Sequence, residues 1–256
     1  MKILVVLRLA PDGEIEIAGD GRSIDREWID MRLNDFDDHA LEQAILLKEA
    51  SGATVLAIAP VADGIQRTLQ AAVARGADEV AVLEHDFGEE PCSRDLCKPI
   101  AALARREKTD LILTGVQCPN DLFGQLAPYL GGLLGWPCVS SVSGARYAAG
   151  AIEIMQEQGN GYSVNLSVAL PAVLGIQAAA QAPRYVSGSK LRQASGFTIG
   201  TIPPAGETFA NLSELVALKQ PDDTGSAVMF DGDPDEVAGH VFDILKLHGL
   251  LGGSRA

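Results

Sequence analysis

Short apolar segments alternate with amphipathic segments along the first half of this chain, and this alternation limits the possible folds more than any other sequence feature. The apolar segments, which are predicted strands, lie at residues 2–7, 54–58, 79–83 and 110–113. The segments with helical periodicity lie at residues 35–50, 63–75, 93–108 and 125–134. Because a helix separates each strand from the next, the strands are expected to pair in parallel. The pattern therefore predicts an α/β fold with a doubly wound, Rossmann-like parallel sheet.

The composition fits helices that pack on parallel strands and excludes several classes of partner. Of the 256 residues, 47% are hydrophobic but only 5% are aromatic, so Ala, Val, Leu and Ile have to build the core. A formal net charge of −14 argues against nucleic acids and anionic membranes as partners. No stretch of about 18 uninterrupted apolar residues occurs, so no membrane span is expected. Residues 1–7 are too short for a signal peptide and the cysteines form no Cys-x-x-Cys pair, which together predict a cytoplasmic protein with reduced thiols.

After Trp136 the alternation stops and a different organisation is expected. Three predicted strands, without long helices between them, lie at residues 146–148, 152–156 and 162–169. A Gly- and Asn-containing hairpin turn is predicted at residues 157–161, and a further buried strand at residues 171–176. These segments predict a small antiparallel addition to the main sheet.

The last quarter of the chain is predicted to form an arm. Residues 183–204 are rich in Ser, Gly and basic residues and are interpreted as a long loop. Two helices are expected beyond it, at residues 211–219 and 234–248. We therefore expect a nucleotide-binding α/β domain over residues 1–204 and, over residues 205–256, a C-terminal helical arm that contacts a partner subunit.

The segment at residues 110–125 carries the strongest functional signal. Its strand breaks at Gly115, and a polar loop then leads into an apolar helix. Ligands of parallel sheets bind beyond the carboxyl ends of the strands, where a helix N-terminus offers free N–H groups to a phosphate. Neither a Walker loop nor a Gly-x-Gly-x-x-Gly fingerprint is present. A nucleotide site and an ordinary strand-to-helix turn are therefore equal alternatives on these residues alone.

Other loops are expected to meet at the same edge of the sheet. They follow the strands at residues 2–7 and 54–58, and the helix start at residues 34–37 should lie beside them. This arrangement would make an adenine–ribose–phosphate pocket of the adenine-nucleotide-binding type. No Lys or Arg lies within residues 115–125, so a phosphate there would depend on helix-end N–H groups.

No catalytic constellation is evident in the sequence. The four histidines are scattered, and the serines at residues 140–143 lack the strand–turn–helix elbow of a hydrolase. A binding or carrier protein, or a subunit whose chemistry belongs to a cofactor, is therefore expected rather than an enzyme with catalytic residues or a metal of its own.

The chain resembles the β subunit of electron transfer flavoproteins in four blocks that follow one another in order. The blocks comprise residues 33–49, residues 72–78, residues 107–117 continued by 134–137, and residues 170–174 with 182–185. The first corresponds to the family's Asn-Pro-Phe-Asp helix, the second to its Ala-x-Gly-Ala-Asp turn, and the third matches without a gap from Gly115 to Trp136. Each block is weak alone, whereas the ordered set is specific and spans most of the chain.

The resemblance implies an electron carrier that forms a heterodimer with an α subunit, which holds most of the FAD. Electrons would pass from a flavin dehydrogenase to a quinone reductase or another acceptor. The β subunit in this family binds AMP or, in the electron-bifurcating branch, a second FAD. The nucleotide site that the resemblance implies comprises Val6, Asn34, Phe36, Asp37, Ile58, Gly115, Gln117, Asn120, Asp121, Gly124, Gln125 and Leu126.

The chain departs from the family pattern inside the nucleotide loop. Gly124 and Leu126 stand where the AMP-type pattern has Asn and Thr, and with Pro128 they are closer to the bifurcating branch. Leu126 is larger than the Val usual in that branch, and Phe123 is foreign to both. AMP, a second FAD and an empty site therefore all stay open.

The second departure lies in the segment that follows Tyr185. The family's Leu-Pro-Asn-Ile-Met-Lys-Ala run is replaced here, and we expect Leu191 to be the apolar anchor for the electron donor, with Lys190 and Arg192 as a basic rim. A stand-alone adenine-nucleotide-binding sensor without a redox role is the alternative function. The C-terminal arm argues for the subunit, because a sensor has no need of a helix beyond its sheet.

Overall fold

The computed structural model describes most of the chain. The described residues are 1–13, 15–25, 27, 29–85, 92–119, 121, 124–148, 150–203, 216–221 and 227–251. Contacts divide the chain into two units, one of residues 1–16 and 24–215 and one of residues 17–23 and 216–256. Each unit is described by itself.

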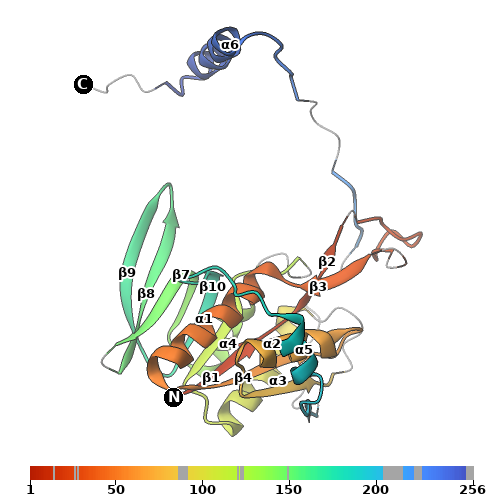
Figure 1. Cartoon of the computed structure of the whole chain (residues 1–256), viewed down its shortest axis with the longest axis vertical. Coiled ribbons are helices and arrows are strands. Elements are labelled where there is room, and N and C mark those ends of the chain that lie inside the picture. Colours follow the sequence, from red (N-terminus) through yellow and green to blue (C-terminus); the bar gives the residue numbers. More distant parts are fainter. Residues whose placement is uncertain are drawn as a thin grey trace. The chain divides into compact units, whose positions relative to one another are not determined.

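A nine-stranded sheet forms the centre of the larger unit, with strand order β11-β5-β4-β1-β6-β10-β7-β8-β9 (Figure 1). The strands are β1 (Lys2–Val6), β4 (Thr54–Pro60), β5 (Glu79–Leu83), β6 (Leu111–Gly115), β7 (Cys138–Ala148), β8 (Ala151–Gly159), β9 (Tyr162–Ala169), β10 (Ala172–Ala178) and β11 (Gly200–Ile202). Every neighbouring pair from β11 to β7 is parallel, whereas β8 and β9 pair antiparallel. The predicted α/β fold with a small antiparallel addition is therefore confirmed.

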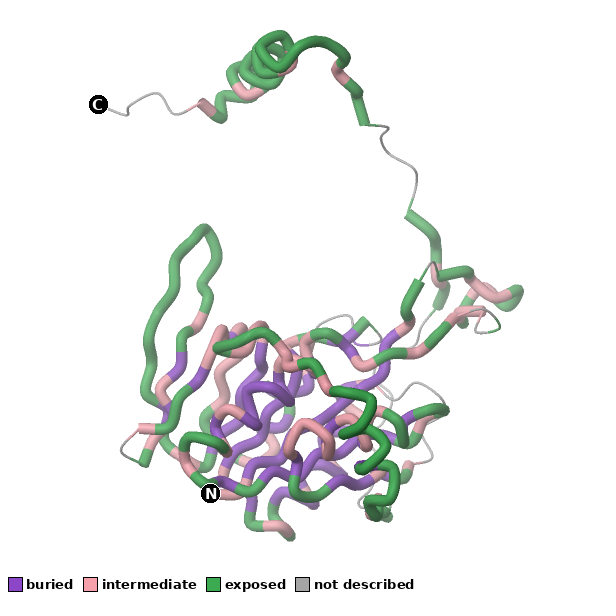
Figure 2. Tube along the Cα trace, in the orientation of Figure 1, coloured by how far each residue is buried: buried purple, intermediate pink, exposed green. Residues whose placement is uncertain are grey.

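Helices cover both faces of the sheet, as a doubly wound fold requires. They are α1 (Asp35–Ser51) and α2 (Ile65–Arg75) on one face, and α3 (Ser93–Arg106) and α4 (Leu126–Leu134) on the other. Along β1, Ile3 and Val5 pack toward α1 and α2, while Leu4 and Val6 pack toward α3 and α4. Figure 2 shows the resulting buried interior in purple. Strands buried on both faces explain the uninterrupted apolar runs of the sequence.

The antiparallel addition differs from its predicted form in two details. The β8–β9 turn consists of Asn160 and Gly161, whose φ angles of 50° and 78° match a two-residue hairpin turn, and is tighter than the predicted 157–161. β7 begins at Cys138 rather than at Arg146, because its first part pairs with β10 and its second part with β8. The serines of that first part have a low propensity for strands, and the strand forms because this segment pairs with β10.

The interpretation of residues 183–204 as a loop is wrong. This segment contains the short helix α5 (Gly188–Ala194) and the edge strand β11. The Ser187 side chain accepts the N–H of Lys190 and so caps the helix. A helix of this length is marginal by itself, and it exists here beside α2, where it buries Ala194. Tertiary contacts of this kind cannot be anticipated from a Ser/Gly-rich composition.

A two-stranded antiparallel sheet stands beside the main one in the larger unit. Its strands are β2 (Leu9–Asp12) and β3 (Asp30–Leu33), which pair from Leu9 with Leu33 to Asp12 with Asp30. The pair brings the chain from the end of β1 to the start of α1.

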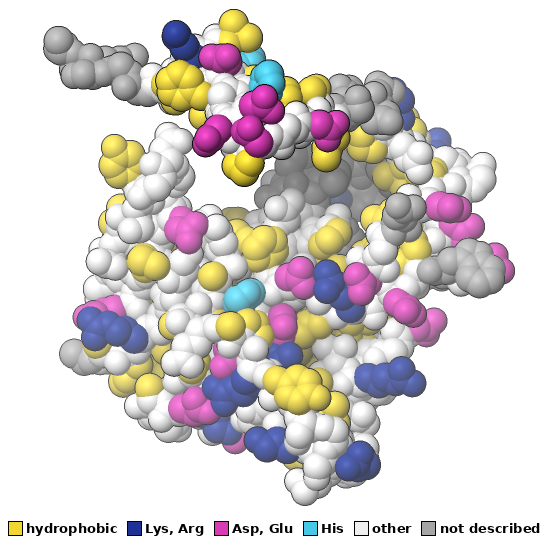
Figure 3. Space-filling model, turned by 45° about the horizontal axis from the view of Figure 1, so that its top comes forward, with side chains coloured by type: hydrophobic (Ala, Val, Ile, Leu, Met, Phe, Trp, Pro, Cys, Tyr) yellow, Lys and Arg dark blue, Asp and Glu magenta, His cyan; other side chains and the backbone are white. Residues whose placement is uncertain are grey.

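The smaller unit contains α6 (Pro234–Leu247), which agrees with the helix predicted at residues 234–248. Asp233 caps it, accepting the N–H groups of Asp235 and Glu236 at 3.0 Å. The helix has no buried residue, and hydrophobic and acidic side chains both cover its surface (Figure 3). Of the helix predicted at residues 211–219, residues 211–215 lie outside the described part and residues 216–219 are not helical.

Candidate functional site

The site lies where the direction of chain winding reverses. From β1 the chain continues through α1 to β4 on one side, whereas β6 pairs with the opposite edge of β1. The carboxyl ends of β1 and β6 therefore flank a topological switch point, which is where doubly wound sheets bind ligands. Arg8 follows β1 at this point and Gly115 ends β6.

A buried ion pair joins β1 to the start of α1. The Arg8 Nε donates to Asp37 Oδ2 at 2.9 Å, and an Arg8 terminal nitrogen donates to Asp37 Oδ1 at 2.9 Å. The Arg8 N–H adds a bond of 3.0 Å to Oδ2. The Asp37 side chain is 0% exposed and that of Arg8 is 4% exposed. Burial acts to lower the pKa of Arg8, but pairing with Asp37 outweighs it, so the pKa is raised and the guanidinium stays charged.

Gly115 completes this ion pair through its backbone. Its N–H donates to Asp37 Oδ1 at 2.6 Å, and its carbonyl accepts from the Arg8 guanidinium at 3.2 Å. A Cβ at this position would lie 2.5 Å from Asp37 Oδ1 and 2.7 Å from the Phe36 Cβ. The close approach of β6 to α1 therefore requires a glycine.

Asp121 organises the loop on the other side of the switch point. Its Oδ2 accepts the N–H of Gln125 at 3.1 Å and the hydroxyl of Ser93, and it lies 3.8 Å from the Arg8 guanidinium. A carboxylate beside the first N–H groups of α4 is favoured by the helix dipole. Because Pro128 has no N–H, a phosphate at this helix end would have to use the N–H groups of residues 126 and 127.

Asn34 ties the start of α1 to the same loop. Its Nδ2 donates to the Gln117 carbonyl at 2.8 Å, and its own N–H donates to the Arg8 carbonyl at 2.9 Å. Asn34 stands at the N-cap position but makes no side-chain cap bond. The Asn34 side chain thus bonds to the loop after β6 instead of to its own helix, which fits a role in shaping the site.

The structure brings together most of the predicted nucleotide-site residues. Those that lie around the switch point are Asn34, Phe36, Asp37, Gly115, Gln117, Asp121, Gly124 and Gln125. Val6, Ile58 and Leu126 are instead buried in the hydrophobic core, so they can offer a ligand backbone atoms only. Asn120 lies outside the described residues.

Gly124 has a structural requirement of its own. Its φ is +59°, and a Cβ there would lie 2.5 Å from the Val116 carbonyl oxygen. A side chain at this position would therefore distort the loop whether or not a ligand is bound. A test of ligand binding has to use a neighbouring residue.

Sequence reasoning missed Arg8 and Ser93. Arg8 lies two residues beyond a buried central strand, and a buried charged residue is almost always paired. With an acidic helix start at the same edge, that signal could have identified the ion pair with Asp37. No comparable signal marks Ser93, which reaches Asp121 only through the tertiary placement of α3.

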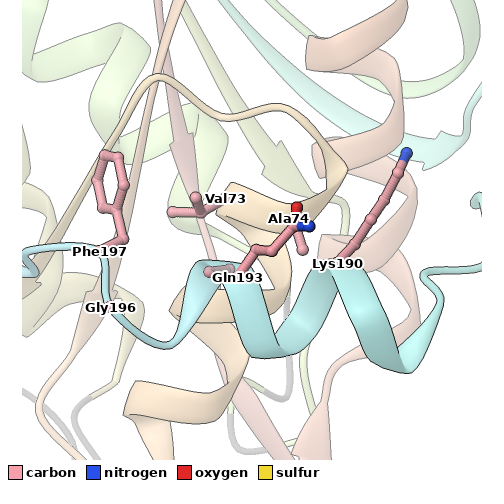
Figure 4. Close-up of a pocket in the computed structure, with 7 residues that line it drawn as sticks. Val73, Ala74, Lys190, Gln193, Gly196 and Phe197 are labelled. Atoms are coloured by element: carbon pink, nitrogen blue, oxygen red, sulfur yellow. The ribbon is translucent and has the colours of Figure 1, made fainter.

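The residues predicted to dock an electron donor lie on α5 rather than on a loop. Leu191 is 37% exposed, and Lys190 and Arg192 are exposed as well. Figure 4 shows Lys190 and Gln193 beside a hollow between α5 and α2. The predicted anchor and its basic rim are thus accessible.

A mostly parallel open sheet with helices on both faces and a buried polar cluster at its switch point places the chain among the doubly wound α/β proteins. The model of the electron transfer flavoprotein domain matches residues 23–199, so the chain belongs to the electron transfer flavoprotein family.

Relatives that cover nearly the whole chain agree with this assignment. An electron transfer flavoprotein subunit beta from Methylophilus methylotrophus is 26% identical, over 96% of this chain and 98% of the relative. An electron transfer flavoprotein subunit beta from Dictyostelium discoideum is 27% identical, over 98% of this chain and 99% of the relative. A mitochondrial one from Oryza sativa subsp. indica is 30% identical over 80% and 82%.

The resemblance to the β subunit of this family is therefore confirmed. Membership implies a role in electron transport, association with a flavin and an electron transfer flavoprotein α subunit as partner. In the part of the chain that the structure describes, no helix combines the length and the apolar character needed to cross a membrane.

Proposed function

We propose that this chain is the β subunit of a heterodimeric electron transfer flavoprotein that carries electrons from a flavin dehydrogenase to a downstream acceptor such as a quinone reductase. The α subunit holds most of the FAD, and this chain contributes an adenine nucleotide site at the switch point. The match to β subunits over nearly the full chain is the observation that carries the proposal. The four free cysteines support a reducing, cytoplasmic location.

The charges at the switch point suggest how AMP, or the AMP half of a second FAD, would lie there. Asp37 is fully buried and both its oxygens already accept N–H groups, so Asp121, whose side chain is 9% exposed, is the carboxylate that would accept a donor such as a ribose hydroxyl. The phosphate would then lie at the start of α4, against the N–H groups of residues 126 and 127. Asn34 fixes the Gln117 carbonyl between these two regions.

The exposed faces of α5 and α6 support contacts with two different partners. Val241, Phe242 and Leu247 of α6 are 45%, 54% and 82% exposed, as expected of an arm over residues 205–256 that contacts the α subunit. On α5, Leu191 would be the anchor for the dehydrogenase, with Lys190 and Arg192 steering an acidic face toward it.

Co-expression with an α subunit tests this proposal. We expect the isolated chain to be colourless, because its sequence has no dinucleotide fingerprint, and the heterodimer to be yellow with the absorbance of FAD. Stoichiometric FAD on the purified lone chain would count against a single flavin held by the α subunit and would favour a second FAD here. Failure of the two chains to associate would refute the subunit assignment.

A further inference from the structure

The connection from β10 to α5 is held against α1 by side chains along its course. It passes over α1 on its way to α5 (Figure 1). His39 Nδ1 accepts the N–H of Ala179 at 3.2 Å, and Gln43 Oε1 accepts the N–H of Ala180 at 3.0 Å. We call residues 179–185 the strap.

Arg184 makes the strongest of these attachments. Its N–H and Nε both bond to Glu42, at 3.0 Å and 2.9 Å, and its two terminal nitrogens bond to Glu49 at 2.6 Å and 3.1 Å. The Glu42 side chain is only 2% exposed, so removal of Arg184 would leave a buried carboxylate without this ion-pair partner. The hydrogen bonds that Arg184 donates to Glu49 and then to Glu42 raise the pKa of Arg184, so its guanidinium stays charged.

The strap leads directly to exposed apolar side chains. Tyr185, the residue after Arg184, is 92% exposed, and Leu191 and Phe197 are 37% and 41% exposed. Tyr is among the residues that contribute most to the centres of protein interfaces. Such a side chain on a firmly held backbone loses little entropy when a partner binds.

Few side chains of α5 pack against the rest of the protein. Ala194 is the one buried residue of this helix, and a hollow of about 480 Å³ separates part of α5 from α2 (Figure 4). Val73 and Ala74 of α2 form one wall, and Lys190, Gln193 and Phe197 line the other side. Apart from the contact of Ala194 with its surroundings, the orientation of α5 therefore depends on the segments before and after it, which are the strap and β11.

We propose that Arg184 is a positioning residue: by its ion pairs with Glu42 and Glu49 it orients a docking surface formed by Tyr185, Leu191 and Phe197. This inference rests on the proposed function, in which that face receives the electron donor. The docking surface then includes Tyr185 and Phe197 besides Leu191, and α1 orients this surface through Glu42 and Glu49.

Hydrogen exchange on the heterodimer tests the positioning role without any donor. In Arg184→Gln we expect amides 186–197 to exchange at least about tenfold faster, while α1 and β10 keep their protection. The double variant Glu42→Gln/Arg184→Gln avoids an unpaired buried charge and should show the same local change. Arg146→Gln, which removes another Arg–Glu pair, with Glu153, is the matched control and should change nothing in this segment. Unchanged exchange of amides 186–197, or loss of protection throughout α1 and β10, would overturn the inference.

A kinetic assay separates the positioning role from the docking function. The probe is the flavin dehydrogenase that reduces the wild-type heterodimer fastest in a panel of purified enzymes. Arg184→Gln should raise KM for the heterodimer by roughly tenfold with a smaller effect on kcat, and Leu191→Ala should do the same. If Leu191→Ala raises KM and Arg184→Gln does not, positioning by Arg184 is refuted and docking stands. If neither variant changes KM, the docking function fails and the role of Arg184 fails with it.

Discussion

Arg8 and Arg184 each meet two carboxylates, and α1 supplies carboxylates to both, but the two clusters lie in different surroundings. Arg8 is 4% exposed and bonds to Asp37, which is 0% exposed, with Asp121 3.8 Å away. Arg184 is 31% exposed and bonds to Glu42 and to the largely exposed Glu49. An arginine with two carboxylates therefore joins the elements of the switch point in the Arg8 cluster, and it holds the strap against α1 in the Arg184 cluster.

The difference in solvent access determines what each cluster contributes. Removing one partner of a buried ion pair leaves an uncompensated charge and costs about 3–5 kcal/mol, whereas an exposed pair contributes about 0–1 kcal/mol. The Arg8 cluster is thus expected to govern folding of the site, and the exposed half of the Arg184 cluster only local order. Both depend on α1, which holds Asp37 in its first turn and Glu49 in its last turns.

The largest effect is expected for Asp37→Asn. Both Asp37 oxygens accept N–H groups, from Arg8 and from Gly115, so the amide nitrogen of Asn would face a donor and Arg8 would lose its counter-charge. We expect the free energy of unfolding in urea to fall by about 3–5 kcal/mol.

Asp35→Asn is the matched control for that variant. Asp35 lies in the same first turn of α1 but is exposed, and its contact with Arg32 is 3.5 Å long. A change of no more than about 0.5 kcal/mol is expected. Equal losses for the two variants would remove the distinction between the buried and the exposed clusters.

A smaller loss is expected for Gly115→Ala. The new Cβ would be pressed against Asp37 Oδ1 and Phe36, so β6 and α1 would have to separate. Overpacking of this kind lowers the free energy of unfolding by about 1–3 kcal/mol. Urea unfolding measures this loss, and the midpoint should fall.

Gly132→Ala in α4 makes the same chemical change where nothing lies within 4 Å of the new Cβ. Because Ala favours helix over Gly, this control should gain about 0.5–1 kcal/mol. A loss at Gly132, or a gain at Gly115, would contradict the close packing described for the switch point.

The smallest effect is expected for Glu49→Gln, and it should depend on pH. Hydrogen bonding to Arg184 lowers the pKa of Glu49 below its usual 4.5 in the folded chain. The stability it contributes is therefore fully present above pH 4.5 and is lost as the pH falls through the folded pKa. Because Glu49 is exposed, the difference between wild type and variant should not exceed about 1 kcal/mol at pH 7.

Urea unfolding of both proteins between pH 7 and pH 3 measures this difference. It should shrink as the pH falls, and added salt should reduce it at pH 7. A difference that persists unchanged at pH 3 would mean that Glu49 acts through packing rather than through its charge.

The parallel half of the fold could be predicted from the sequence because its signals are local. Each buried strand is an apolar run, and each of the helices α1 to α4 carries an apolar face, such as that of Ala40, Ala44 and Leu47 in α1. The segments that were misjudged, the first part of β7 and the pair α5 and β11, exist through pairing with neighbours distant in sequence. Their Ser- and Gly-rich composition contains no information about those neighbours.

The candidate site was predictable in position but not in its electrostatics. The loops after three predicted strands were expected to meet at the carboxyl edge of the sheet, and the Asn and Asp residues near them indicated a polar site. The ion pair of Arg8 with Asp37 was not anticipated, because it joins residues from two elements whose distance only the fold determines. The buried Glu42 was missed for the same reason, since its partner Arg184 is far away in sequence.

If the switch point of this chain binds an adenine nucleotide in the heterodimer, the nucleotide can be extracted from the purified complex and identified. Gln125→Glu places a carboxylate at the start of α4, which the helix dipole tolerates and a phosphate does not. Gln66→Glu makes the same change in the first turn of α2, which follows β4 rather than β6. We predict that wild type and Gln66→Glu release one equivalent of AMP or of FAD beyond that of the α subunit, and that Gln125→Glu has lost it. Equal nucleotide content in all three heterodimers would contradict the site.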